Sequence, residues 1–216
     1  MLFRSVWGRI GCGGLAPIKR RQQERTSELT EELRRCFDLL RAVIATKPSR
    51  TIEIWPHTGP RFLAASDAAL EIPGQGTGGF LVVWHDGCIQ RREAFVSIIP
   101  PVVYNLWEPG DTKIAQLELL QVLYALFTRP STFRGRRGLW FIDNTAALMA
   151  LIRGRSDNAD LEHMTRLIHI TLFALQAWFF WEWIPSKANW SDEISRDGLQ
   201  ATWHRRHGFT THFAVF

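Results

Sequence analysis

Two acidic residues stand where a carboxylate is costly unless it binds something. Asp143 ends the apolar run 139–142 and is followed at once by a helical pattern. Glu118 lies among Ile114 and Val122 at helical neighbour spacing, on a face that is otherwise apolar. Burying a carboxylate without a partner is strongly unfavourable, and a bound cation would offset that cost. Asp143 is therefore a candidate for binding a cation, and Glu118 calls for a partner.

The first half of the chain predicts a strand, a hairpin and a helix around these acids. A short strand at 62–66 leads into Asp67, a third candidate acid. The β-rich runs 79–85 and 88–99, separated by Asp86-Gly87, predict a tight hairpin. Apolar residues at helical spacing predict a helix that starts at an Asp111 cap and runs to about 127.

The second half predicts crossover units. The predicted elements are a strand at 138–143, a helix at 145–153 closed by Gly154, a helix capped by Asp157 or Asn158, a strand at 179–184, and a last short helix that starts at Asn189 or Ser191 and runs through Asp192. This order indicates an α/β fold with a central mixed five-stranded sheet flanked by helices. The first and fourth strands would be central neighbours, so acids from positions 67, 118, 143 and 192 could meet.

A separate amphipathic helix is expected near the amino end. Leu29, Leu33 and Phe37 recur at helical spacing, Thr26 or Ser27 could cap the helix, and residues 46–60 read as a linker. Pro48 would end it. The expected organisation is a basic extension at 1–60, an α/β domain at 61–197 and a carboxyl-terminal tail at 198–216. Residues 197–216 carry no pattern that predicts an element.

Charge and composition narrow the choice of partners. The net charge is +5, and all of the excess lies in residues 1–60. A basic surface there would attract polyanions such as nucleic acid, and solvated side chains without a partner are the alternative. No apolar run is long enough to span a bilayer, so no membrane contact is expected.

The three cysteines form no CxxC pair, which argues against a disulfide framework or a zinc knuckle and favours a reducing compartment. The expected location is intracellular, in the nucleus or cytoplasm. Residues 1–23 are basic and free of acids, as in a mitochondrial presequence, but Gly11 and Pro17 interrupt any helix there. Gly74, Gly76 and Gly79 match GxGxxG, yet they precede a strand where a dinucleotide site needs a helix.

Four segments together resemble the ribonuclease H family, in particular the ribonuclease H domain of DIRS-like retroelement reverse transcriptases. The segments are Ala65-Ser66-Asp67-Ala68-Ala69, Gln116-Leu117-Glu118-Leu119-Leu120, Phe141-Ile142-Asp143-Asn144-Thr145-Ala146-Ala147 and 183–196. The resemblance covers roughly residues 61–197, and the helix at 27–45 looks like the segment that joins a polymerase thumb to such a domain. The chain has no Tyr-x-Asp-Asp motif, so polymerase chemistry is not expected in it.

The resemblance implies hydrolysis of the RNA strand of an RNA–DNA hybrid with two Mg²⁺ ions, or Mn²⁺ in their place. Asp67 would bridge the ions, Glu118 and Asp143 would flank them, and Asp192 would be the fourth ligand, with Glu193 as its competitor. A polymerase domain is a possible partner. The residues expected to contact nucleic acid are Asn144, Lys187, Asn189 and Arg196.

Several alternatives remain open at the level of sequence. Asp143 and Asp192 could simply cap helices, and Glu118 could form a buried salt bridge. Many cellular ribonucleases H carry a histidine before the last helix, and the segment 185–191 has none, although Lys187 could contact phosphate. The chain could therefore be an inactive nucleic-acid-binding module, or a DNA nuclease or transposase of the same fold.

Overall fold

The structure is a computed structural model that describes residues 17–18, 20–24, 27–45, 61–72, 75–108 and 113–214. Its elements alternate between strands and helices along the chain. They are α3 (Glu31–Ala45), β1 (Arg61–Ile72), β2 (Gln75–Asp86), β3 (Ile89–Ile99), α4 (Pro101–Tyr104), α5 (Ile114–Thr128), α6 (Pro130–Phe133), β4 (Arg137–Ile142), α7 (Thr145–Arg153), α8 (Ala159–Ala174), β5 (Trp178–Trp183), η1 (Ser186–Ala188), α9 (Asp192–Asp197), η2 (Gly198–Gln200), α10 (Trp203–Arg206) and β6 (Thr210–Phe213).

The strands form one mixed sheet in the order β5-β4-β1-β2-β3-β6. The β1–β2 and β2–β3 pairs are antiparallel, whereas β4 runs parallel to both β1 and β5. Strands β1 and β4, the first and the fourth, are central neighbours, as the sequence predicts. Antiparallel strands first and parallel crossover units after them give the ribonuclease H-like fold, which confirms the expected fold class.

The expected count of five strands is wrong by one. Residues 210–213 form β6, which pairs parallel with β3 between Glu93 and Val96. This strand is short and carries Thr-Thr-His-Phe, so it shows neither the alternation nor the apolar run by which a strand is recognised in sequence. Residues 210–213 form a strand because they pair with β3, and their own sequence does not indicate one.

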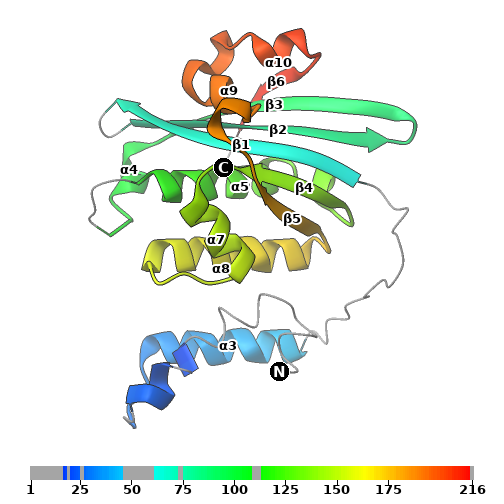
Figure 1. Ribbon diagram of the computed structural model, residues 1–216. Helices are drawn as coiled ribbons and strands as arrows, with labels where there is room; N and C mark the ends of the chain where they lie inside the picture. Colours follow the sequence, from blue (N-terminus) through cyan, green and yellow to red (C-terminus); the bar gives the residue numbers. More distant parts are fainter. Residues whose placement is uncertain are drawn as a thin grey trace.

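Helices α5, α7 and α8 cover one face of the sheet, and α9 and α10 lie on the other (Figure 1). The main core lies under the three helices and includes the fully buried Trp140 and Phe133. Helix α5 is buried along nearly its whole length between the sheet and α8, which explains why its sequence is apolar on all sides. Parallel strands require such crossover helices between them.

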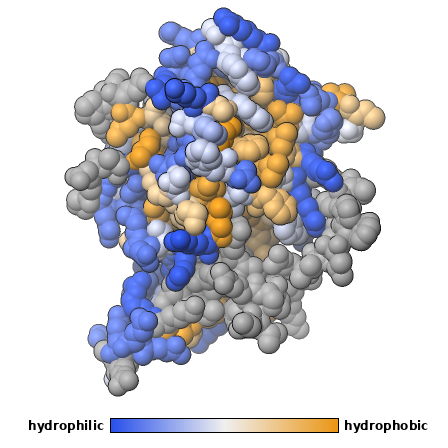
Figure 2. Space-filling model, viewed as in Figure 1, coloured by the Kyte–Doolittle hydropathy of each residue, from blue (hydrophilic) through white to orange (hydrophobic). Residues whose placement is uncertain are grey.

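The opposite face is only partly covered. A smaller cluster joins α9 and the segment after it to β2 and β3, with Ile194 and Leu81 at its centre. Leu63, Leu139 and Phe180 lie side by side in register on β1, β4 and β5, and they are exposed by 40, 39 and 58%. Figure 2 shows apolar side chains in the middle of the visible face and hydrophilic ones above them.

Most local predictions in the described part agree with the structure. Gly87 has φ 60° in the hairpin turn, and Gly154 ends α7 at φ 68°. Asn158, one of two expected caps, accepts a hydrogen bond from the Leu161 amide at 3.0 Å. Gly76 and Gly79 lie within β2, so the glycine-rich run does open a strand.

Helix α3 begins later than the sequence predicts. The Leu33 amide donates to Thr30 Oγ1 at 3.3 Å, so Thr30 caps the helix where Thr26 or Ser27 was predicted. Leu33 and Cys36 are buried, and α3 lies beyond α8, on the side away from the sheet (Figure 1). Among the described residues, no helix is both long and apolar enough to cross a bilayer.

Some sequence predictions fall on residues that are not described. These are the caps assigned to Thr26 and Asp111, the helix stop at Pro48, the linker 46–60, the glycine Gly74 and, in the presequence-like segment 1–23, residues 1–16 and 19. They lie outside the described residues and stay predictions.

Candidate metal centre

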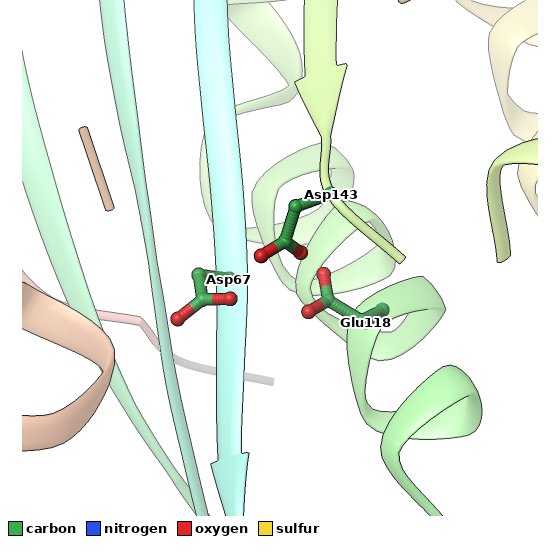
Figure 3. Close-up of side chains that lie close together, drawn as sticks. All are labelled: Asp67, Glu118 and Asp143. Carbon is green, nitrogen blue, oxygen red and sulfur yellow. The ribbon is translucent and has the colours of Figure 1, made fainter. Parts of the chain in front are cut away.

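Three acids meet beside the central strand β1, near the carboxyl end of β4. Asp67 lies within β1, Glu118 lies on α5 and Asp143 follows the last residue of β4. One carboxylate oxygen from each lies within 4.8 Å of the others, and Figure 3 shows the three carboxylates turned toward one another. The convergence predicted for these three positions is therefore present.

The sheet register explains how they meet. The pairing of β1 with β4 ends at Ala65 and Phe141, and Asp67 and Asp143 each follow two residues later, Asp143 just after the end of β4. Helix α5 packs across β1, and the Ala68 amide donates to Glu118 Oε1 at 3.2 Å. The strand thus holds both its own acid and the acid of the helix.

The centre carries uncompensated negative charge. Asp67 and Glu118 are 5% and 1% exposed, and within the part of the chain that the structure describes neither they nor Asp143 form an ion pair. Glu118 Oε2 is buried and has no hydrogen-bond partner among the described residues. A buried anionic oxygen without a partner is strongly unfavourable.

The electrostatics reflect this crowding. Burial, with repulsion from Asp143 and Asp192, raises the pKa of Asp67 to about 6, against a hydrogen bond from Ser195 that lowers it. Burial raises the pKa of Glu118 well above its usual range, and the charges of Asp67 and Asp143 add to the rise. Carboxylates in this state favour a proton or a cation.

Asp192 lies at the rim of the same site. It is the first residue of α9, and its charge acts on Asp67. Its Oδ1 accepts a hydrogen bond from Arg196 Nη2 at 2.9 Å in an ion pair on the same helix. Glu193 is turned elsewhere, because its two oxygens accept hydrogen bonds from Thr202 and the Trp203 amide, which lower its pKa.

The simple structural alternatives for the acids fit the structure poorly. Helix α7 is capped by Asn144, whose Oδ1 accepts from the Ala147 amide at 3.0 Å, so Asp143 is not the cap. Asp192 lies inside α9, and the cap position before it is Ser191. Glu118 has no basic partner among the described residues, as noted above.

An open pocket of about 550 Å³ surrounds the acids. Its lining includes Asp67, Ala68, Ala69, Leu70, Ile114, Glu118, Asp143, Asn144, Ser186, Asp192 and Arg196. The walls combine acidic and apolar groups with one arginine. A phosphodiester backbone could therefore reach the acids from solvent.

The four residues expected to contact nucleic acid differ in their placement. Asn144 and Arg196 line the pocket, and Lys187 is exposed on η1 nearby in sequence. Asn189 is 6% exposed, and its amide donates to the Ser66 carbonyl oxygen at 3.0 Å while its oxygen accepts from Ser191. Its side chain is occupied within the protein.

Two neighbours of the centre were missed in the sequence. Ser195 donates a short hydrogen bond to Asp67 Oδ2, and Trp183 Nε1 donates to the Asp143 carbonyl oxygen at 3.1 Å. Ser195 stands three residues after Asp192, so helical spacing could have placed it on the same side of the helix. Nothing in the sequence marks the Trp183 contact.

The donor set suits a hard divalent cation. Magnesium and manganese prefer oxygen ligands, and the centre offers carboxylate oxygens on three separate elements. The unpartnered Glu118 oxygen and the raised pKa of Asp67 both indicate a place where positive charge is favoured. The residues present therefore fit a magnesium-type ion.

Comparisons with known proteins give structural likeness only. No protein-family profile and no curated protein sequence matches the chain. Ribonuclease H1 from Halobacterium salinarum is 17% identical, with 64% of this chain and 99% of that chain covered and a TM-score of 0.43. The amino-terminal ribonuclease H domain of a Mycobacterium tuberculosis protein, solved as a fusion with maltose-binding protein, is 13% identical, with 69% and 99% covered and a TM-score of 0.43.

A foamy viral protease-reverse transcriptase, solved in complex with double-stranded DNA, is 12% identical over 64% of this chain and 92% of that chain, with a TM-score of 0.39. Scores of this size carry no inference about function. The fold assignment rests on the strand order and register of the chain itself, and the site rests on its own three acids.

Proposed function

We propose that this chain is a divalent-metal-dependent nuclease that hydrolyses the RNA strand of RNA–DNA hybrids. The observation that carries the proposal is the meeting of Asp67, Glu118 and Asp143 in one pocket, where none of the three forms an ion pair with the described part of the protein. The four sequence segments that resemble ribonucleases H contain these acids in the expected order. Fold and site thus support the same reading.

In this mechanism the protein holds charge and orients the substrate. Asp67, Glu118 and Asp143 would hold the ions, because one carboxylate oxygen of each lies within 4.8 Å of the others. When bound, two divalent ions activate a water molecule for attack and stabilise the departing 3′ oxygen. Asn144 and Arg196, which line the pocket, would contact phosphate oxygens, as would Lys187, which is exposed and follows the lining residue Ser186.

The fourth ligand is proposed to be Asp192. It lines the pocket with the three central acids, whereas both Glu193 oxygens accept hydrogen bonds from residues 202 and 203. Asp192 would have to leave its ion pair with Arg196 to bind an ion. Because that pair is partly exposed, its loss costs about 1 kcal/mol or less.

The biological setting is part of the proposal. The motif set favours a retroelement reverse transcriptase with a polymerase domain as partner, and α3 would then belong to the connection between the two. The unit boundaries at 1–60, 61–197 and 198–216 remain predictions. Because β6 pairs with β3, removal of residues 198–216 is expected to lower the melting temperature of the full chain.

One observation favours an inactive nucleic-acid-binding module as the second candidate. Asp192 is paired with Arg196, and the segment 185–191 contains no histidine that could assist proton transfer. Such a module would bind hybrids through the same pocket without cleaving them.

The deciding experiment is a cleavage assay on a labelled RNA–DNA hybrid with Mg²⁺ or Mn²⁺, with Asp143→Asn as control. Cleavage of the RNA strand by the wild type alone supports the proposal. Metal-independent binding without cleavage supports the inactive module, and cleavage of double-stranded DNA in a parallel reaction supports a DNA nuclease or transposase. Single-stranded RNA as substrate excludes a contaminating ribonuclease.

A further inference from the structure

A buried hydroxyl on α9 touches the acidic centre. Ser195 is fully buried, and its Oγ forms a short hydrogen bond to Asp67 Oδ2. The same oxygen lies 2.8 Å from the main-chain oxygen of Asp192. The Ser195 side chain thus connects Asp67 on β1 with Asp192, the proposed fourth ligand, on α9.

The hydrogen bond fixes the orientation of the Asp67 carboxylate. Rotation about the bond to a carboxylate group has broad minima, so without a partner the group would sample many orientations. Figure 3 shows one oxygen of Asp67 directed toward Glu118 and Asp143 and the other directed away from them. A donor on a single oxygen selects one orientation, and a serine hydroxyl has one proton to give.

The donor itself is held rigidly. Ile194, beside it on α9, is 1% exposed and packs so closely on Gly79 that a Cβ there would lie 2.8 Å from its Cγ2 atom. Gly79 is the residue of β2 that pairs with Asp67. On the other side, Asn189 ties the segment before α9 to the Ser66 carbonyl oxygen. The helix with the donor and the strand with the acid therefore keep a fixed distance.

We propose that Ser195 is a positioning residue of the metal centre, which holds Asp67 in the orientation that binds a divalent cation. The inference rests on the proposed function. Residues that orient a metal ligand commonly contribute about 10- to 100-fold to metal affinity. Ser195 acts through Asp67 and contacts neither the ion nor the substrate.

The test measures metal affinity directly on the full 216-residue chain. Metal-free wild type, Ser195→Ala and Ser195→Cys are titrated with Mn²⁺ and with Mg²⁺ by calorimetry, and thermal unfolding is recorded without metal. Cysteine keeps nearly the shape of serine but is a weak donor, so it separates the hydrogen bond from packing. Ser97→Ala is the matched control, because Ser97 is 1% exposed and donates to the Gln121 side chain at 2.6 Å, away from the acids.

The expected result is a Kd for the metal about 10- to 100-fold higher in both Ser195 variants, with Ser97→Ala within about twofold of wild type. The metal concentration for half-maximal hybrid cleavage should rise in parallel. An unchanged Kd in Ser195→Cys overturns the inference, as does an equal rise in Ser97→Ala. If wild type binds no metal and cleaves nothing, the proposed function fails as well, which is a distinct outcome.

Discussion

Two sites on the sheet differ in whether their carboxylates form ion pairs. Glu93 of β3 lies 3.3 Å from Arg129 and 3.7 Å from His212, so its charge is matched where β6 and the end of α5 join the sheet. At the centre formed by Asp67, Glu118 and Asp143, more deeply buried acids crowd together without an ion pair in the described chain. Glu93 thus has a basic partner within the protein, whereas the three acids of the centre have none among the described residues.

This difference indicates what each site is for. At the Glu93 site, Arg129 also lies over the Phe95 ring at 5.5 Å and His212 stacks on that ring. Arg129 therefore supplies, from within the protein, the charge opposite to that of Glu93. The acidic centre stays unbalanced, and it can be balanced only by protons or by added cations. The predictions below test this contrast.

The largest effect is expected for hydrolysis. Asp143→Asn should lower the rate of hybrid cleavage by about 1000-fold or more, because it removes one anionic ligand from the centre. Glu93→Gln should change the rate by no more than about twofold. Both rates are measured with saturating Mg²⁺. A similar loss in the two variants would remove the distinction between the sites.

The second effect is a change of stability with pH. The rise of the Asp67 pKa from 3.8 to about 6 makes its ionised form unfavourable by roughly 3 kcal/mol in the folded state. The folded state therefore binds the proton more tightly than the unfolded state, and this contribution to stability is lost as pH rises from about 4 to about 6.

Asp67→Asn should accordingly be more stable than wild type at pH 7.5 without metal, by up to roughly 3 kcal/mol, with little difference below pH 4. Urea unfolding at a series of pH values measures the gap. If the gap does not change with pH, Asp67 is not held in an unfavourable ionised state.

Added metal gives the third effect. Mg²⁺ at ten times its Kd should stabilise the wild type at pH 7.5 by about 1.4 kcal/mol, because it binds the folded state only. Glu118→Gln should lose most of this gain, whereas Glu93→Gln should keep it. The free energy of unfolding is compared with and without metal. Equal stabilisation of all three proteins would point to binding elsewhere.

The smallest effect concerns the balanced site. Glu93→Gln should lower the free energy of unfolding by about 1 kcal/mol, since its partly exposed pair with Arg129 contributes modestly. Thermal unfolding measures it in metal-free buffer. A gain in stability would show that Glu93, like the central acids, is under electrostatic strain.

The acids could be predicted because each stands at a place that the sequence marks. Asp143 follows an apolar strand, and Glu118 interrupts an apolar helix. Their meeting with Asp67 follows from the parallel pairing of β1 and β4, which the order of elements implies. The junction before β5 could not be located, since Gln176 takes a φ of 52° where glycine is the usual signal.

Contacts that depend on how the elements pack together could not be predicted from the sequence. Ser195 reaches Asp67 only because Ile194 seats against Gly79, a distance that no spacing rule gives. Asn189 looked like a contact for nucleic acid, yet it faces inward because the Ser66 carbonyl oxygen needs a donor. β6 is defined by pairing with a strand more than a hundred residues earlier.

The distance along the chain between Asp67 and Ser195 has a consequence for synthesis. The two residues are 128 positions apart. On a translating ribosome, at about 5 to 20 residues per second, Ser195 is added roughly 6 to 26 s after Asp67. The nascent β1–β3 meander can form in that interval, but Asp67 has no partner hydroxyl until α9 emerges.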